Sequence, residues 1–302
     1  MIVALTGGTG FVGRRLIALA VEAGHEVRAL TRRRQAAEPG VSWIEGALDN
    51  PAALATLVDG ADAVIHVAGV VRAPDRAGFT VGNIDGTRAI VAAALGAGVD
   101  RFVHVSSLAA RAPALSDYGW SKAESEQLVC SAALPSAVIV RPPAVYGPGD
   151  LEMLDTFRVA RWGVAFTPPA GRMAVIHVDD LARLLLALAA DAAYGGVLEP
   201  DDGTPGGWSH ADFLGHAIGK AVGKRVTPIA LPRPLLSLAA RIDGALRGAD
   251  ARLTPDRVGY MCHPDWTVDP LRRPDPALWQ PQIPTRDGLA ETVAWYRAQE
   301  LL

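Results

Sequence analysis

Cysteine, long apolar runs and an excess of either charge are the features that this sequence lacks. Its 302 residues include two cysteines, Cys130 and Cys262, which lie far apart and outside any CxxC pattern or Cys/His cluster. They offer neither a disulfide framework nor the ligand spacing of a zinc site. The longest apolar run, residues 181–190, is interrupted by Arg183, and residues 2–6 are too few for the core of a signal peptide. The formal net charge of only −3 gives no reason to expect a nucleic-acid or membrane partner. From the cysteines and the missing signal peptide, we expect a cytoplasmic protein without a metal.

Short apolar runs alternate with longer helical patterns through the first half of the chain. The expected strands are near-continuous apolar runs, as is typical of strands buried on both faces: residues 2–6, 26–31, 41–44, 63–67, 102–106 and 137–141. The expected helices between them are residues 10–23, 51–58, 83–97 and 118–134. This alternation predicts βαβ units and therefore a doubly wound parallel α/β sheet. Only residues 32–40 connect the second and third strands, so we expect a degenerate helix there.

A glycine-rich turn follows the first expected strand directly. Gly7, Gly10 and Gly13 have the spacing GxxGxxG at the start of an expected helix, with Phe11 and Val12 between the last two. Such glycines permit a positive φ, a close approach of the backbone to a pyrophosphate, and tight packing of helix on strand. The helix N-terminus favours the negative charge of the phosphates. A glycine-rich turn without a ligand is the alternative, but the flanking strand and helix favour a Rossmann dinucleotide site.

The second half of the chain has a different composition. Pro and Gly are frequent, and helical patterns remain at residues 178–190, 210–222, 235–246 and 287–299. We expect residues 1–150 to form the Rossmann domain, with residues 174–199 returning to it. Residues 151–302 are then mainly a smaller region that binds a small-molecule substrate.

Arginines follow the second expected strand, at the place where NAD-binding folds often carry a carboxylate for the ribose 2′-hydroxyl. Here Arg32, Arg33 and Arg34 follow Thr31. A guanidinium pairs well with a 2′-phosphate, so NADP(H) is favoured, with Arg32 and Arg33 as its ligands. NAD(H) and a solvated basic loop are the alternatives.

Tyr118 and Lys122 are spaced i, i+4 in an expected helix, which places both side chains on one face. A free Tyr has a pKa of about 10, and a nearby ammonium group favours the phenolate. Lowering this pKa by ~3 units requires about 4 kcal/mol of differential stabilisation. The spacing is common by chance. However, the fifth expected strand ends at Ser106 and is followed by Ser107, and ligands of such sheets bind at the carboxyl ends of the strands. Asn83 is expected to cap the helix of residues 83–97.

Together these motifs resemble the extended or atypical branch of the short-chain dehydrogenase/reductase superfamily, the NAD-dependent epimerase/dehydratase type. The segments that carry the resemblance are residues 6–13, 64–69, 83–87, 105–107, 118–122, 141–149 and 176–182. It is strong up to about residue 190 and weaker beyond. The resemblance implies an oxidoreductase that interconverts a carbonyl and an alcohol by hydride transfer, and the arginines after the second strand favour NADP(H) as its cofactor.

The resemblance also implies a role for each matching residue. Tyr118 would be the general acid/base, Lys122 would bind the nicotinamide ribose, and Ser107 rather than Ser106 would orient the substrate. The implied cofactor contacts are Leu48 at the adenine, Ala68 and Gly69 at the adenosine and ribose, and Pro142, Ala144 and Val145 beneath the nicotinamide.

Departures from the family's pattern narrow the reaction. Residues 108–110 read Leu-Ala-Ala, where dehydratases have Asp-Glu after the active-site hydroxyl, so dehydration is disfavoured. The family often has an Asp at the position of Ala47, before Leu48. Met173 and Ala174 replace an Arg-Asp pair common in sugar-nucleotide enzymes, although Arg172 is adjacent. This argues against binding of a UDP-sugar and mildly favours an apolar or aromatic substrate.

Two other functions stay open. One is a nucleotide-sugar epimerase with tightly bound NAD(P). The other is a non-catalytic NAD(P)-binding scaffold or sensor, against which the intact Ser, Tyr and Lys set argues. The oligomeric state is expected to be a monomer or a homodimer.

Two further segments have simple interpretations. An Asp in the segment from His177 to Asp180 is expected to cap the helix of residues 178–190. The helix at residues 235–248, with Arg241 and Arg247, is amphipathic enough to touch a membrane, but a helix that covers the substrate cleft is the favoured interpretation.

Overall fold

The computed structural model describes residues 1–248 and 251–302. They fold as two compact units, which are described separately. Unit 1 comprises Met1–Pro142, Leu181–Glu199 and Pro274–Trp279, and unit 2 comprises Pro143–Asp180, Pro200–Arg273 and Gln280–Leu302. Within the described residues, none of the helices combines the length and the apolar character needed to cross a bilayer.

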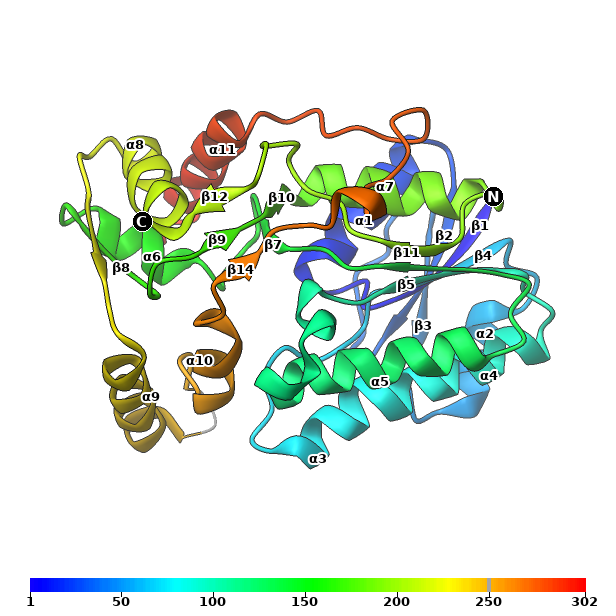
Figure 1. Ribbon diagram of the computed structural model, residues 1–302. Helices are drawn as coiled ribbons and strands as arrows, with labels where there is room; N and C mark the ends of the chain where they lie inside the picture. The colour runs from blue at the N-terminus through cyan, green and yellow to red at the C-terminus, as the bar shows by residue number, and fades with distance from the viewer. Residues whose placement is uncertain (249–250) are drawn as a thin grey trace. The chain divides into compact units, whose positions relative to one another are not determined.

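Unit 1 is built on a seven-stranded parallel sheet with the strand order β11-β6-β5-β4-β1-β2-β3 (Figure 1). Its strands are β1 (Ile2–Thr6), β2 (Glu26–Thr31), β3 (Val41–Glu45), β4 (Ala63–His66), β5 (Arg101–Val105), β6 (Ser136–Val140) and β11 (Gly196–Leu198). The predicted doubly wound α/β fold is confirmed, and six strands lie within one residue of their predicted bounds. The strand order reverses between β1 and β4, which is where such sheets bind ligands.

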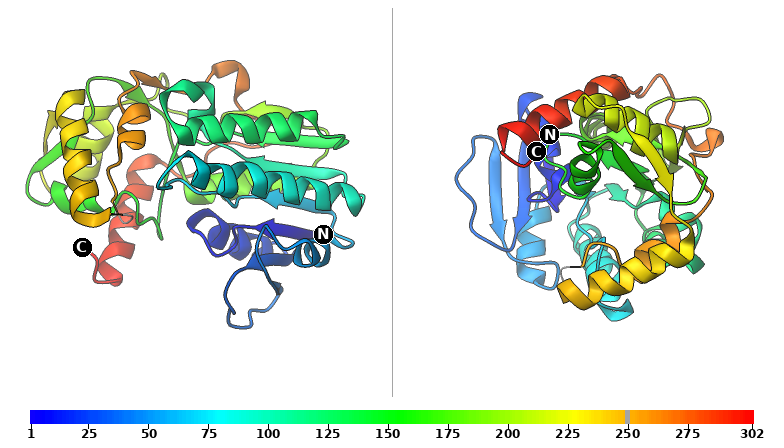
Figure 2. Two further views of the ribbon diagram at one scale, coloured as in Figure 1. Left: turned by 90° about the horizontal axis from the view of Figure 1, so that it is seen from below. Right: turned by 90° about the vertical axis from the view of Figure 1, so that its left-hand side faces the viewer.

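Helices cover both faces of this sheet. On one face lie α2 (Pro51–Val58), α4 (Gly86–Gly96) and α5 (Asp117–Ser131), and on the other lie α1 (Phe11–Glu22) and α7 (Val178–Ala190) (Figures 1 and 2). A cluster of fully buried side chains joins the first group to the sheet: Leu57, Ile90, Ala94, Val64 and Phe102. Residues 32–40, all of which are described, form bends and a turn without a helix.

The helix expected from residue 83 begins earlier than predicted. The segments α3 (Arg76–Phe79), η1 (Thr80–Asp85, a π-helix) and α4 form one helical run. Asp75 caps it, because its carboxylate accepts a hydrogen bond of 2.9 Å from the Gly78 N–H. The prediction that Asn83 caps this helix is therefore wrong. Asn83 lies inside the π-helical turn, and turns of this kind are frequent at functional sites.

Unit 2 combines three small sheets with helices. β7 (Ala144–Tyr146) pairs with β10 (Val175–His177), β8 (Val164–Thr167) pairs with β13 (Thr227–Ala230), and β9 (Arg172–Met173) pairs with β12 (Trp208–Ser209) and β14 (Asp265–Trp266). The helical segments are α6 (Leu154–Ala160), η4 (Ala211–Ala217), α8 (Ile218–Val222), α9 (Arg233–Arg247), α10 (Pro255–Met261), η6 (Pro270–Arg272) and α11 (Thr285–Ala298). Aromatic edges fill its core, where Tyr146 packs against Phe213 and Phe157 against Tyr296.

The acidic residues near the start of α7 do not occupy the cap position. Asp179 and Asp180 lie inside the first turn of the helix. The Asp180 carboxylate accepts hydrogen bonds from the N–H groups of Gln282 and Ile283, at 2.8 and 3.1 Å. It therefore anchors the segment before α11, and the prediction of an acidic cap is wrong.

Candidate active site

The glycine-rich turn leaves the N-terminus of α1 open. Gly7 has φ +78°, and a Cβ there would lie 2.7 Å from the backbone nitrogen of Ala68. A Cβ at Gly13 would collide with the Gly7 oxygen and would lie 2.7 Å from the Gly8 Cα. Gly10, at the cap position, has no side chain to cover the first N–H groups of α1. These N–H groups, from Phe11 onward, form the cradle that a pyrophosphate needs, so the residues present fit a dinucleotide.

The loop after β4 lies beside this turn and close to α5. The Ala68 N–H donates a hydrogen bond of 3.3 Å to Thr6 Oγ1, at the end of β1. A Cβ at Gly69 would come within 2.9 Å of Asn83 Oδ1 and 3.7 Å of Lys122 Nζ. The structure thus brings the predicted residues Gly7, Ala68, Gly69 and Lys122 together, and glycine at 69 leaves room for both neighbours.

Asn83 fastens this loop to α5. Its Oδ1 accepts a hydrogen bond of 2.7 Å from the Val70 N–H, and its Nδ2 donates to Val70 O and to Ser121 Oγ, at 3.0 and 2.8 Å. Ser121 in turn donates to the Tyr118 carbonyl, at 2.8 Å. The side chain of Asn83, buried to 98%, therefore positions residues on both sides of the candidate site.

Tyr118 and Lys122 lie one turn apart on α5, in the predicted helix. Lys122 is buried, and its ammonium group donates a hydrogen bond of 2.8 Å to the Val105 carbonyl at the end of β5. Burial lowers the pKa of Lys122 to about 8, against the opposing effect of Glu126. Tyr118 is half-buried, with its ring 6.2 Å from that of Phe79.

The two serines after β5 face different surroundings. The buried hydroxyl of Ser106 donates to Glu126 Oε1. Ser107 is half-buried and caps a short helix, η2 (Leu108–Arg111), by accepting a hydrogen bond of 3.2 Å from the Ala109 N–H. Because the Ser107 oxygen only accepts in this bond, its hydroxyl group can still donate a hydrogen bond to another partner. The three residues that follow Ser107 are buried and apolar, so no acid or base occupies the dehydratase positions.

A buried ion network that the sequence did not reveal extends from Glu126. Arg141, after β6, pairs with Glu126 through both Nε, at 2.8 Å, and Nη2. Arg141 also reaches Glu199 at 3.3 Å, and Arg111 reaches the other oxygen of Glu199 at 3.1 Å. The Glu199 side chain is fully buried, and the bonds to Glu126 raise the pKa of Arg141. One signal was present in the sequence, since Glu126 lies one turn beyond Lys122 on the same helix face.

The remaining predicted cofactor residues have separate positions. Arg32 and Arg33 are exposed after β2, where Thr31 Oγ1 donates to the Arg33 carbonyl at 2.7 Å. Leu48 is half-buried and packs on Gly86 of α4. Pro142 is buried, and its carbonyl accepts a hydrogen bond of 3.1 Å from the Leu108 N–H. The other two predicted residues, Ala144 and Val145, belong to β7 of unit 2.

Across residues 1–248 and 251–302, no group of three His, Cys, Asp or Glu side chains is placed to hold a metal ion.

Comparisons with known proteins identify the relatives of this chain. The model of the NAD dependent epimerase/dehydratase family matches residues 3–198. Ceramide reductase of Caulobacter vibrioides is 37% identical over 310 residues, which cover 98% of this chain and 95% of that protein. A 4-hydroxy-2-methyl-3-oxo-4-farnesyl-3,4-dihydroquinoline-1-oxide ketoreductase of Stigmatella aurantiaca is 32% identical over 67% of this chain and 68% of its own length. The solved structure of MoeE5 in complex with UDP-glucose and NAD has a similar fold, with a TM-score of 0.75 and 22% identity over 99% of both chains.

The ion network yields a prediction on stability. Glu126→Ala would leave Arg141 with one carboxylate partner in place of two, and we expect the free energy of unfolding to fall by about 3 kcal/mol. Asp85→Ala, which removes an exposed partner of Arg88, is the control, with an expected loss below about 1 kcal/mol. Urea unfolding followed by circular dichroism measures both. Equal losses would show that the network contributes no more than a surface pair.

The lowered pKa of Lys122 yields a prediction on pH. The unfolded state binds the Lys122 proton up to pH 10.5 but the folded state only up to about pH 8, so stability rises with pH across this window. Relative to Lys122→Met, we expect the free energy of unfolding of the wild type to increase by about 3 kcal/mol from pH 8 to 10.5. Urea titrations of both proteins at several pH values test this, and parallel pH profiles would contradict it.

Proposed function

Because this chain belongs to the NAD-dependent epimerase/dehydratase family, we propose that it is an NADP(H)-dependent reductase that converts the ketone of a long-chain lipid into an alcohol. The observation that carries the proposal is the 37% identity to ceramide reductase along almost the full length of both proteins. The farnesylated substrate in the name of the second relative supports an apolar substrate as well. The buried Leu108, Ala109 and Ala110 after Ser107 favour reduction over dehydration.

The proposed chemistry needs three side chains of unit 1. When bound, the dinucleotide would supply the hydride that the carbonyl carbon accepts. The Tyr118 hydroxyl gives its proton to the carbonyl oxygen, so that the C=O bond becomes a CH–OH group. The Ser107 hydroxyl, whose proton is not used within the cap of η2, donates a hydrogen bond to the same oxygen. This positions the carbonyl and stabilises the charge that develops on it.

Lys122 is assigned to binding of the cofactor and to stabilisation of the Tyr118 phenolate. Its ammonium group lies near Gly69 and is held by the Val105 carbonyl, which suits contact with the nicotinamide ribose. Its positive charge favours the phenolate of Tyr118 as the proton leaves. Leu48, Ala68 and Gly69 are assigned to the adenosine half of the cofactor, and Pro142, Ala144 and Val145 to the nicotinamide. The substrate chain is assigned to unit 2.

Two alternatives make different predictions. A nucleotide-sugar epimerase would return the hydride to its own substrate, so it would turn over UDP-glucose without net consumption of NADPH and would retain its cofactor on purification. A scaffold or sensor would bind NADPH without turnover. A fall in the absorbance of the reduced cofactor identifies the reductase, and conversion of UDP-glucose without that fall, followed by chromatography, separates the epimerase from the scaffold. The assay compares a ceramide oxidised to its ketone in detergent micelles, a short-chain ketone, and UDP-glucose.

Replacement of the proposed acid tests the mechanism. We expect Tyr118→Phe to lower kcat for the lipid ketone at least about 100-fold, because the proton donor is lost, while NADPH still binds. Tyr194→Phe is the matched control, since Tyr194 is also a half-buried tyrosine of unit 1, and its kcat should stay within about twofold of wild type. Unchanged turnover in Tyr118→Phe would refute the assignment.

Replacement of the arginines tests the cofactor preference. The double variant Arg32→Ala, Arg33→Ala should weaken NADPH binding at least tenfold, because two charge-assisted contacts to the 2′-phosphate are lost. NADH binding should change less than about threefold, as should binding of either cofactor to Arg34→Ala. Fluorescence titration of the reduced cofactor measures these affinities. Tighter binding of NADH than of NADPH by the wild-type protein would overturn the preference.

A further inference from the structure

Helix α9 of unit 2 exposes an apolar face. The helix packs on α10 through Leu236 and Ala240, which are buried with Val258. Its other large apolar side chains stay exposed, namely Leu235 at 52%, Leu238 at 54%, Ile242 at 52% and Leu246 at 81%. The two views of Figure 2 place α9 at the periphery of unit 2. The packing on α10 therefore accounts for only part of the apolar character of this helix.

The four exposed side chains form one stripe. At 100° per residue, positions 235, 238, 242 and 246 fall within an arc of roughly 80° on the helix surface. The buried positions 236 and 240 lie on another side, so the stripe is distinct from the face that contacts α10. By the same spacing, position 241 lies beside the stripe on the helix surface, next to Leu238.

The strand that leads into α9 carries further exposed apolar groups. Ile229 on β13 is paired directly with Phe166 on β8, so the two side chains leave the same face of this two-stranded sheet. Phe166 is 55% exposed and Ile229 is 40% exposed. Exposed apolar side chains of unit 2 thus occur on β8 and β13 as well as on α9.

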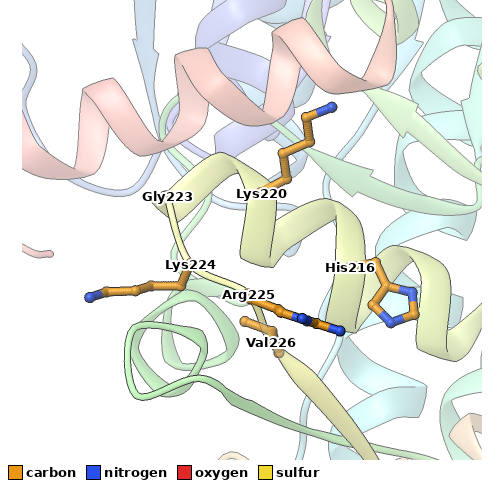
Figure 3. A pocket seen from close by; sticks show the side chains of 6 residues that line it. All are labelled: His216, Lys220, Gly223, Lys224, Arg225 and Val226. Carbon is orange, nitrogen blue, oxygen red and sulfur yellow. The ribbon is translucent and has the colours of Figure 1, made fainter.

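Positive charge is concentrated in the same part of the chain. Residues 213–242 contain five Lys or Arg residues and no Asp or Glu, although the whole chain has a formal net charge of −3. Lys220, Lys224 and Arg225 line a shallow hollow of about 460 Å³ together with His216. Figure 3 shows the Lys224 and Arg225 side chains leaving their loop in opposite directions. Charges that diverge in this way suit an extended negative surface better than a single bound phosphate.

We propose that unit 2 docks on an anionic phospholipid bilayer through the stripe of α9. The stripe, with Phe166 and Ile229, enters the boundary between headgroups and acyl chains, and the basic residues of this segment face the anionic headgroups. A second copy of the chain is a poorer occupant of this face, because a symmetric contact would place the Arg241 residues of both copies near each other. The inference reverses our preference for a helix that covers the cleft and our expectation of no membrane partner.

Sedimentation of the full chain with vesicles tests the proposal. We expect binding to vesicles of phosphatidylglycerol and phosphatidylcholine at a ratio of 3:7, and at least tenfold weaker binding to pure phosphatidylcholine. Leu238→Glu with Ile242→Glu should lower the affinity for the anionic vesicles at least tenfold. Leu271→Glu is the matched control, since Leu271 is 93% exposed outside α9, and it should bind within about twofold of wild type. Arg241→Gln should weaken binding about threefold and reduce its salt dependence.

Several outcomes would overturn the proposal. The first is equal vesicle binding by the wild type and the α9 double variant. The second is a wild-type dimer, seen by analytical ultracentrifugation, that the double variant converts to a monomer without any vesicle binding, because a second copy would then cover the stripe. The third is an α9 double variant that binds vesicles like the wild type but has a raised KM for a short-chain ketone, because the stripe would then face the substrate. The docking does not rest on the proposed reductase activity. Vesicle binding without turnover of any ketone would refute that activity and leave the docking intact.

Discussion

The side-chain amide of Asn83 is the contact on which the candidate site most depends. A primary amide has two donor hydrogens and an acceptor oxygen in one plane, and Asn83 uses all three, on Val70 and Ser121. Ser121 directly precedes Lys122 on α5, and Val70 directly follows Gly69. One buried group therefore fixes the loop on the side of the cofactor relative to the helix that carries the proposed acid. Asn83 lies in the π-helical turn η1, within the helical run, and from there its side chain reaches the loop after β4.

The charged network around Arg141 solves a related problem at the neighbouring strand ends. Buried ion pairs are often no more stabilising than apolar residues of the same size, since desolvation offsets the attraction between the charges. Their effect here is geometric. Glu126 holds the Ser106 hydroxyl inward, so of two adjacent serines only Ser107 is left in the half-buried position. Glu199 joins Arg141 to Arg111, which fixes the short helix that begins after Ser107. The network thus determines which of the two serine hydroxyls is available at the carboxyl end of β5.

Local patterns predicted most of the sheet and the backbone of the site. Strands buried on both faces are continuous apolar runs, and the glycine turn and the Tyr118–Lys122 spacing are contained within single elements. The start of the helix at Arg76 was missed because Gly78 and Gly82 weaken the helical pattern there, and tertiary packing overrides that local preference. The partnership of Arg141 and Glu199 spans 58 residues. It arises because β6 and β11 are neighbours in the sheet, so no spacing in the sequence could reveal it.

The expectation of no membrane partner rested on the net charge of the whole chain. Electrostatic attraction to a surface depends instead on the charges that lie close to that surface. The Debye length at physiological ionic strength is about 8 Å, whereas a helix of 15 residues such as α9 is about 22 Å long. A lipid surface beside α9 therefore interacts mainly with the charged groups on or near α9. It interacts hardly at all with acidic residues that lie farther away in the chain's fold. Apolar burial is local in the same way, because each exposed leucine gains only from the phase that it enters. A near-neutral chain can thus carry one face suited to an anionic bilayer, and the exposure of individual side chains decides where that face lies.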